Sequence, residues 1–398
     1  MKTLLRAAAC LWLLVGLPAQ AVNVVFTDAE RSADGLAFHM DRAGDLYPPG
    51  NVPVNTAAML NGDDKRPAVN LADPEFAGLK GLYRWESARN SPNWQALVRH
   101  AGITPSRDFD LDWLLIQQAL RGAVVDRIDA LQAPDVVLAI HGFNNTHAES
   151  IGWYQLFEAD LRRRNPRAEF VRMYWDGLSY GKGPGIWGEA QYNGPGVGHQ
   201  LRRILNRLRP DLPLRVFTHS SGAFVLSNAL GDGTGGFDPD DLSDAFMARA
   251  GGAPGYEYPS QLEDLRIAML VPAAPLSTFA NFRQGERGAI PVRVILGTSR
   301  KDSATSKFWA RCRWSGDTCM SNKPRKACAW VREGLGIDPP RLAVVDFHRP
   351  FGLFHYHGHG VDSYIEDPEW VQLVSQLFDE RPELPAGTRR WCDPPLGA

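Results

Sequence analysis

The chain has 398 residues, of which 44% are hydrophobic and 10% aromatic, and its formal net charge at pH 7 is −2. Disordered chains combine low hydrophobicity with high net charge, so this composition indicates a globular protein with a large core. The near balance of acidic and basic residues gives no strong basic field. Nucleic acid is therefore not expected as a partner.

The first 21 residues have the pattern of a signal peptide. Lys2 and Arg6 form a basic start, residues 7–17 are apolar, and Ala19-Gln20-Ala21 has the small-x-small form of a cleavage site. The apolar run is shorter than a typical membrane-spanning helix. We expect cleavage after Ala21, a mature chain in the periplasm or outside the cell, and no stable membrane anchor.

Residues 22–130 form an N-terminal extension with no clear strand–helix rhythm. Within it, residues 22–27 (Val-Asn-Val-Val-Phe-Thr) predict a first strand, and apolar spacing predicts helices at 93–101 and 111–122. No linker composition separates this extension from the rest of the chain. We therefore predict one domain over residues 22–398.

From residue 134 onward, apolar runs alternate with helical patterns. The runs lie at 135–140, 169–175, 214–218, 265–271, 292–296 and 342–347. Near-continuous β-branched runs of this kind are typical of parallel strands covered on both faces. Helices fit between them, and Asp367 followed by Pro368 predicts the start of a C-terminal helix. The alternation predicts a doubly wound α/β sheet.

A long insertion at residues 298–340 interrupts this pattern and carries most of the cysteines. The chain expected after cleavage keeps Cys312, Cys319, Cys328 and Cys392. An even number of cysteines in an exported protein favours two disulfides, and three pairings remain open. Zinc is the alternative, although the spacings lack a CxxC pair.

Residues 218–222 (Thr-His-Ser-Ser-Gly) lie between a strand and a helical run that starts at Gly222. A serine on such a strand-to-helix turn is exposed at the carboxyl end of a sheet, as in the G-x-S-x-G pattern of serine hydrolases. Thr218 replaces the first glycine and adds bulk at the turn. We predict Ser220 as the nucleophile; the alternative is that Ser220 only caps the helix.

Residues 141–145 (His-Gly-Phe-Asn-Asn) directly follow the strand at 135–140. A tetrahedral intermediate needs two N–H donors for its oxyanion. One is expected from Ser221, which follows the nucleophile, and the other from Phe143 in this loop. Gly142 permits the backbone angles of such a loop.

A serine hydroxyl needs a histidine base and a carboxylate that orients it. The histidine is expected after the last strand, and we choose His359 from the cluster of His355, His357 and His359, with His357 as the alternative. Asp302, which follows the strand at 292–296, is chosen as the acid; Asp317 and Asp362 are its rivals. The three histidines could instead bind a metal.

The stretch 141–230 resembles the uncharacterised serine-esterase-like branch of the α/β-hydrolase superfamily. The residues that carry the resemblance are the loop 141–145, a strand ending at Trp175, and His219-Ser220-Ser221-Gly222; His359, Tyr364 and the helix start at 366–368 extend it. It covers residues 135–230 well and 265–380 loosely. The resemblance implies an α/β-hydrolase fold and hydrolysis of an acyl bond, without naming a substrate.

Together these features predict an exported carboxylesterase- or lipase-like enzyme that acts on a small-molecule or lipid-like acyl substrate and needs no cofactor or metal. We expect His141, Gly142, Trp175 and His219 to contact that substrate. Amide or thioester hydrolysis on the same groups is an alternative. Another is a degenerate hydrolase that only binds. The sequence leaves the oligomeric state open.

Overall fold

The structure is a computed structural model, and it describes residues 24–33, 35–60, 78–177, 184–230, 262–274, 292–305, 319–335, 342–347 and 358–379. The signal peptide expected at residues 1–21 lies outside these ranges. Within them, no helix combines the length and the apolar character that crossing a membrane requires.

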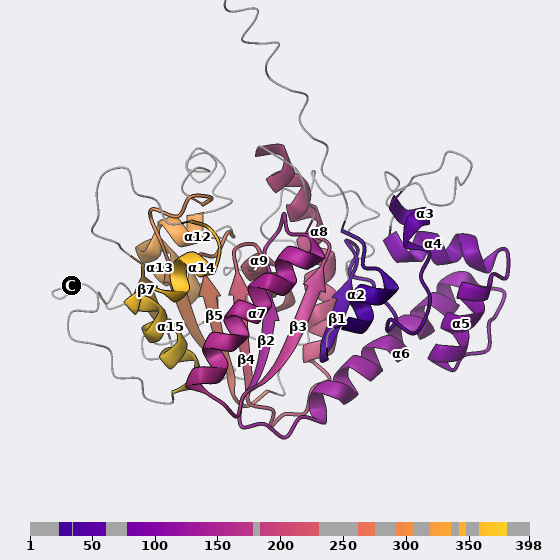
Figure 1. The fold of residues 1–398 in the computed structure, drawn as a ribbon, viewed down its shortest axis with the longest axis horizontal. Helices are drawn as coiled ribbons and strands as arrows, with labels where there is room; N and C mark the ends of the chain where they lie inside the picture. The colour runs from indigo at the N-terminus through magenta and orange to yellow at the C-terminus, as the bar shows by residue number, and fades with distance from the viewer. Residues whose placement is uncertain are drawn as a thin grey trace, which may run out of the picture.

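Seven parallel strands form one sheet in the order β1-β3-β2-β4-β5-β6-β7 (Figure 1). Their bounds are β1 Ala37–Met40, β2 Val136–Ile140, β3 Glu169–Trp175, β4 Leu214–His219, β5 Leu265–Leu270, β6 Val292–Thr298 and β7 Leu342–Asp346. Every residue of β2, β4 and β5 is buried, because helices cover both faces of the sheet. The prediction of an α/β protein with a parallel sheet is confirmed.

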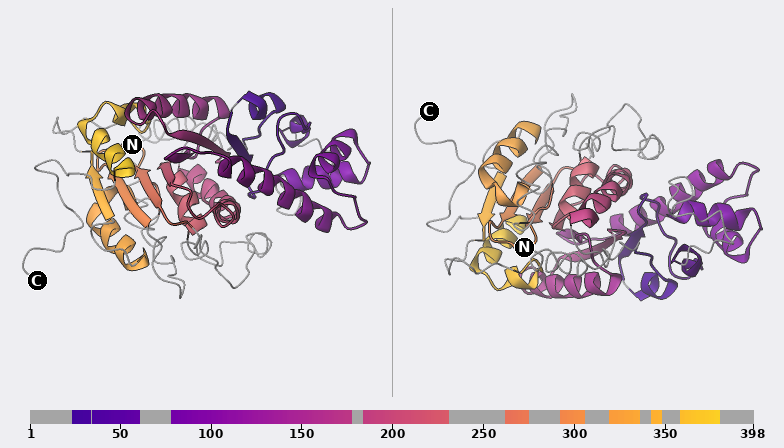
Figure 2. Two further views of the ribbon diagram at one scale, coloured as in Figure 1. Left: turned by 90° about the horizontal axis from the view of Figure 1, so that it is seen from below. Right: turned by 90° about the horizontal axis from the view of Figure 1, so that it is seen from above.

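The helices are α2 Asp28–Ala33, α3 Thr56–Leu60, α4 Gly78–Ser87, α5 Pro92–Ala101, α6 Phe109–Asp129, α7 His147–Arg164, α8 Pro184–Leu205, α9 Gly222–Leu230, α12 Cys319–Asn322, α13 Pro324–Leu335, α14 Asp362–Ile365 and α15 Pro368–Phe378. Helices α7 and α15 cover one face, and α8, α9 and α13 cover the other (Figure 2). The indole Nε1 of Trp370 in α15 donates to Asp160 in α7 (2.6 Å), which joins the two helices of the first face.

The strand order reverses direction between β2 and β4. These strands are neighbours, with Ile140 opposite Thr218. The chain leaves β2 for β3 on one side and leaves β4 for β5 on the other. In open parallel sheets, ligands bind in the crevice that such a reversal opens beyond the carboxyl ends of the strands. Two predicted motifs, the loop 141–145 and the pentapeptide 218–222, follow these two strands.

The first predicted strand, at residues 22–27, is wrong where the structure describes it. Residues 24–27 pair with no strand, and the edge strand β1 begins later, at Ala37, where it pairs with Arg172 of β3. Phe26 is nonetheless 1% exposed, and the backbone N–H of Val24 donates to Asp176 Oδ1 (2.8 Å). The segment is apolar because it packs over the sheet edge, which a periodicity argument cannot distinguish from strand pairing.

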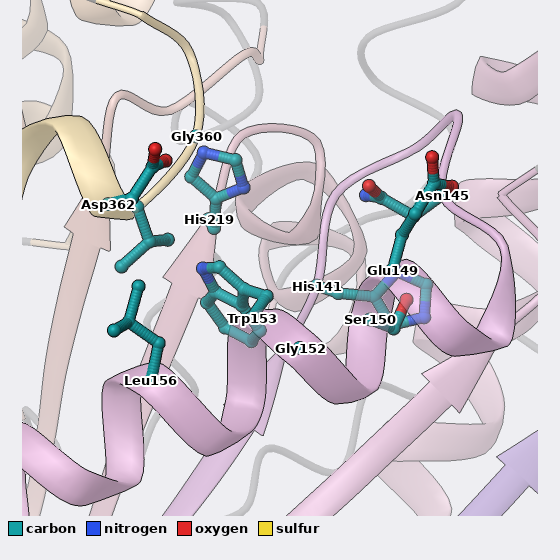
Figure 3. Close-up of a pocket in the computed structure, with 11 residues that line it drawn as sticks. His141, Asn145, Glu149, Ser150, Gly152, Trp153, Leu156, His219, Gly360 and Asp362 are labelled. Carbon is teal, nitrogen blue, oxygen red and sulfur yellow. The ribbon is translucent and has the colours of Figure 1, made fainter.

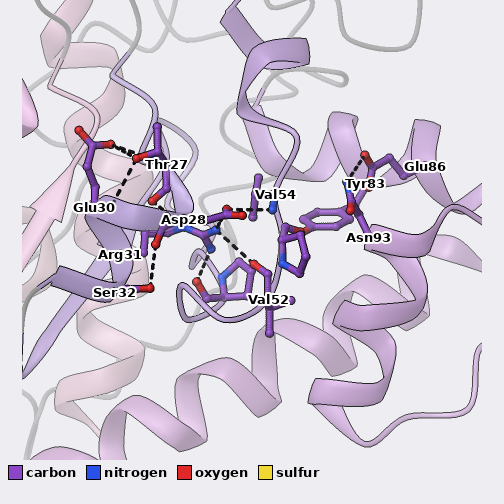
Figure 4. Close-up of polar contacts among 12 residues, drawn as sticks. Thr27, Asp28, Glu30, Arg31, Ser32, Val52, Val54, Tyr83, Glu86 and Asn93 are labelled. Carbon is purple, nitrogen blue, oxygen red and sulfur yellow. Dashed lines mark hydrogen bonds and ion pairs between the residues drawn. The ribbon is translucent and has the colours of Figure 1, made fainter.

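A buried arginine fastens the N-terminal extension. The guanidinium of Arg31 in α2 donates to the backbone oxygens of Pro48 and Val52 and pairs with Asp28, so that the loop after β1 is tied to α2 (Figure 4). Tyr83 Oη of α4 donates to Pro53 O (3.2 Å) in the same loop. The helices predicted at 93–101 and 111–122 are confirmed as α5 and α6.

Part of the cysteine-bearing insertion is described and contains the helices α12 and α13. Cys328 in α13 is disulfide-bonded, and Cys319 is the first residue of α12. Cys312 and Cys392 lie outside the described residues. The backbone N–H of Met320 donates to Ala274 O (3.4 Å), which places α12 against the loop that follows β5.

Candidate active site

Ser220 occupies the sharp turn between β4 and α9. Its φ angle is 53°, in the left-handed region that non-glycine residues seldom adopt. Its backbone N–H donates to Leu270 O (3.0 Å), so the turn is held against β5. Gly142 makes the approach possible: a Cβ there would lie 2.9 Å from the Ser220 Cβ. Such strained backbone persists at functional sites because the surroundings enforce it.

Thr218 does not lie in the turn itself. It is an interior residue of β4, fully buried and paired with Ile140 and Met269. A β-branched residue is well suited to this extended position. The departure from glycine at the first position of the G-x-S-x-G pattern therefore causes no crowding at Ser220, since the sharp bend begins one residue later, after His219.

Ser220, His359 and Asp302 form one chain of hydrogen bonds. Ser220 Oγ lies 2.8 Å from His359 Nε2, and His359 Nδ1 lies 2.9 Å from both carboxylate oxygens of Asp302. The three residues come from the turn after β4, the segment before α14 and the turn after β6. A carboxylate accepts, so Nδ1 carries hydrogen and Nε2 is left to accept from the serine hydroxyl.

Asp302 is fully buried and saturated with donors. Besides His359, its Oδ1 accepts from the backbone N–H and the hydroxyl of Thr305 (2.7 and 2.9 Å), and its Oδ2 accepts from Tyr364 Oη (2.6 Å). Burial alone would raise the pKa of Asp302, but His359 and these hydrogen bonds lower it well below its usual range. The carboxylate therefore stays ionised and fixes the orientation of the imidazole.

The loop after β2 faces the turn at Ser220. The backbone N–H of Phe143 donates to Ser221 Oγ (2.6 Å), and Asn145 Nδ2 donates to Gly142 O (3.1 Å), bracing the loop. The backbone N–H of Ser221 has no acceptor among the described residues and lies just before the first residue of α9. Helix N-termini carry unsatisfied N–H groups and partial positive charge, so this position favours an anion.

His141 and Trp175 support the loop from below. Trp175 donates from its backbone N–H to His141 Nε2 (3.1 Å) and from its indole to His141 O (2.9 Å). His141 Nδ1 lies 2.7 Å from Gly142 O and must donate to it. Burial lowers the pKa of His141 to about 4. Trp175 is 1% exposed, so a substrate would have to displace its neighbours to contact it.

His219 holds the segment that carries the base. Its Nε2 lies 2.7 Å from the backbone oxygen of His359, which can only accept, so Nε2 carries the hydrogen. The two rings also pack at a centroid distance of 4.8 Å. Burial, followed by the neighbouring His359, lowers the pKa of His219 to about 3. His219 is therefore a neutral imidazole, and its Nδ1 is an acceptor with no hydrogen-bond partner among the described residues.

A cavity of about 280 Å³ adjoins this arrangement over α7 (Figure 3). Its walls are the loop after β2, the first turns of α7, the ring of His219 and the segment that follows His359. The lining residues are His141, Asn145, Glu149, Ser150, Gly152, Trp153, Leu156, His219, Gly360, Val361 and Asp362. Two of these lining residues, His219 and Gly360, are the sequence neighbours of Ser220 and His359.

All the residues predicted for catalysis and for the oxyanion lie together at this end of the sheet, and Asp362, a rival acid, lines the cavity instead. His355, His357 and Asp317 lie outside the described residues. Within the described part of the chain, no three histidine, cysteine or acidic side chains are grouped so as to hold a metal ion.

Sequence reasoning missed Tyr364 and Thr305, whose hydroxyls fix Asp302. It also missed the support that Asn145 gives to the loop backbone. A signal existed for Tyr364, which is part of the motif that extends the family resemblance beyond His359. Thr305 had none, because its role follows from a turn within the insertion.

Comparisons with models of protein families, with curated proteins and with solved structures found no match to this chain. The seven-stranded parallel sheet establishes an α/β fold, and the family resemblance depends on the motif residues alone.

Proposed function

We propose that this protein is a serine hydrolase that cleaves acyl esters, with Ser220 as nucleophile. One observation carries the proposal: the hydrogen-bond chain from Ser220 Oγ through His359 to a buried, ionised Asp302. A serine hydroxyl becomes nucleophilic when a positioned imidazole takes its proton and a carboxylate stabilises the imidazolium that forms.

The reaction proceeds in two steps. Ser220 Oγ attacks the ester carbonyl carbon while its proton moves to His359 Nε2, and collapse of the tetrahedral intermediate breaks the ester bond as His359 returns the proton to the leaving alcohol. Water then attacks the acyl-enzyme while giving a proton to His359, and collapse of the second tetrahedral intermediate releases the acid as His359 returns that proton to Ser220 Oγ. Asp302 holds the imidazole in the required tautomer throughout.

The oxyanion is held by the backbone N–H groups of Ser221 and Phe143. The first stands at the positive end of α9 with no acceptor among the described residues. The second donates to the Ser221 hydroxyl (2.6 Å). Rotation of this hydroxyl releases the Phe143 N–H as the carbonyl oxygen of the substrate arrives.

The α/β-hydrolase fold is part of the same proposal. It is supported by a parallel sheet whose order reverses at β2 and β4, a serine with positive φ between β4 and α9, and an acid and base that follow β6 and β7 in the chain. This fold gives the chain order serine, acid, histidine. Residues 220, 302 and 359 have that order.

The test is covalent labelling by a fluorophosphonate probe, which reacts with activated serines. We expect rapid labelling of the mature protein and none of Ser220→Ala, because the alanine variant lacks the attacking oxygen. Equal labelling of the two proteins would overturn the proposal. Ser227→Ala is the matched control, since Ser227 is a buried serine of α9 whose hydroxyl bonds only within the helix (to Ala223 O, 2.7 Å).

A further inference from the structure

The cavity over α7 presents hydrogen-bond acceptors and few donors. His219 Nδ1 is an acceptor because Nε2 donates to His359 O, and it has no partner among the described residues. Asn145 uses its amino group on Gly142 O and Phe143 O, which leaves its amide oxygen as the group to offer. The carboxylates of Glu149 and Asp362 only accept. Trp153 adds one donor to the lining, since its indole Nε1 is buried without a partner among the described residues. A ligand that fits this lining has to donate to several groups and can accept at one.

The charges of the lining residues also favour a ligand that donates hydrogen bonds. The carboxylates of Glu149 and Asp362 stand on opposite sides of His219 at the cavity (Figure 3). No lysine or arginine is among the described residues that line the cavity. Burial keeps His141 and His219 neutral, with pKa values lowered to about 4 and about 3. The lining therefore carries negative charge without a compensating cation.

Unpaired polar atoms of buried lining side chains supply an independent indication of a ligand. Ser150 is 1% exposed and lines the cavity, yet its Oγ has no hydrogen-bond partner among the described residues. Buried polar atoms in native structures are seldom left unpaired, and such an atom is explained by a ligand or a water that the structure lacks. Ser150 Oγ has almost no accessible surface, so the unpaired acceptor that an occupant reaches is His219 Nδ1, in a lining side chain that is 6% exposed.

The aromatic wall argues against a sugar as that occupant. Sugars stack on an open aromatic face, whereas the Trp153 ring is stacked with Phe157 (5.5 Å between centroids, 3° between planes) and packed against Tyr154 and His219. Leu156 and Val361 add apolar surface to the wall. A small alkyl group bearing a protonated amine satisfies both the apolar wall and the acceptors.

We propose that this cavity binds a protonated alkylamine on the leaving-alcohol side of the ester, so that the enzyme prefers esters of amino alcohols. The leaving oxygen takes its proton from His359, and residues 360–362 directly after His359 form one wall. The lining includes Gly360, the residue next to His359, but no residue that holds the oxyanion, so the cavity lies beside the base. The inference rests on the proposed serine-hydrolase function.

The test measures how well two alcohols of equal shape protect Ser220 from the fluorophosphonate probe. The pair is 2-(dimethylamino)ethanol, which is protonated at pH 7, and 3-methylbutanol, its neutral counterpart. We expect the amino alcohol to slow labelling at an about fivefold lower concentration, the size typical of exposed ion pairs. The preference should shrink as salt is raised, because ions screen exposed charges.

The double variant Glu149→Gln, Asp362→Asn should lose this preference. Glutamine at 149 can keep the capping contact with Thr146, so α7 is preserved. The matched control is Asp211→Asn, Glu263→Gln, which removes two exposed carboxylates at the amino ends of β4 and β5 and should keep it. Asp362→Asn alone should lose part of the preference, and it serves if the double variant melts early.

Equal protection by the two alcohols, no protection by either, or a preference that survives in the double variant would each overturn the inference. Those results leave the labelling of Ser220 intact and so leave the proposed function standing. Failure of the wild-type protein to label at Ser220 would overturn the proposed function, and the inference with it.

Discussion

Two groups of histidines differ in what their ring nitrogens do: His39 with His147 near the sheet edge, and His219 with His359 at the candidate site. Near the sheet edge, His39 and His147 pack with Phe26 and Tyr174, and His39 stacks on Tyr174 at 4.7 Å. The Nε2 atoms of both histidines are buried without a partner among the described residues. In the second group, each ring nitrogen of His359 has a partner, Ser220 on one side and Asp302 on the other.

The two groups of histidines also differ in their exposure to solvent. The side chain of His359 is 23% exposed, whereas His39 and His147 are 4% and 5% exposed. An imidazole can move protons for a substrate only if it is hydrogen-bonded in a relay and reachable from solvent. A cluster of buried histidines is therefore not enough to identify a catalytic site, whereas a hydrogen-bonded relay that solvent can reach is evidence for one. His39 and His147 belong to the hydrophobic core.

Among variants of the two histidine groups and their partners, Asp302→Asn is expected to reduce the rate of ester hydrolysis most. An amide in place of the buried carboxylate can donate to His359 Nδ1, which stabilises the wrong tautomer for accepting the serine proton. We expect kcat to fall about 10⁴-fold with little change in KM. Steady-state kinetics on a chromogenic ester measure this. A loss of less than about tenfold would mean that Asp302 is not the acid of the relay.

A smaller effect is expected at His219, which holds His359 through its backbone oxygen. His219→Leu removes this hydrogen bond, and we expect kcat to fall about tenfold, as for loss of one neutral hydrogen bond. Glutamine can donate to the same oxygen, so His219→Gln should recover most of the rate. Equal losses in both variants would show that packing, rather than the hydrogen bond, positions the base.

His39→Phe is the corresponding change in the first group, and it should leave ester kinetics unchanged. Its effect is on stability at acid pH. Burial lowers the pKa values of His39, His141 and His219, so the folded protein binds fewer protons than the unfolded chain below about pH 6.5. Stability therefore falls as pH falls, from about 6.5 down to about 4 for His141 and about 3 for His219.

Each such histidine contributes a slope of up to about 1.4 kcal/mol per pH unit in that range. Removing His39 should make the loss of unfolding free energy between pH 6 and pH 5 smaller by about this amount. Urea unfolding of wild type and His39→Phe at the two pH values measures it. An unchanged slope would show that His39 is protonated in the folded state.

The sequence predicted the central strands well, because their apolar β-branched runs are long and bounded by loops. It failed at the sheet edge, where β1 is only the four residues Ala-Phe-His-Met and its neighbour at 24–27 is the more apolar segment. Strand pairing at an edge is decided by tertiary contacts, here with Arg172 and its neighbours in β3.

Some residues of the candidate site could likewise be predicted from the sequence, and others could not. Ser220 and the loop 141–145 were predictable because each follows a strand directly and has a local pattern. The acid had no pattern of its own, and Asp302 was chosen by its place after a strand; Asp362 fitted nearly as well. The cavity over α7 was not predictable, since Glu149, Trp153 and Asp362 meet only through packing of α7 beside α14. The roles of all these residues stay predictions.

The most direct measurement of the central claim is the rate of fluorophosphonate labelling in His359→Gln and His357→Gln, with the modified residue located by mass spectrometry. The account predicts that Ser220 is the labelled residue, that His359→Gln abolishes rapid labelling, and that His357→Gln labels like wild type. Loss of labelling in His357→Gln with rapid labelling in His359→Gln, or label on another serine, would contradict it.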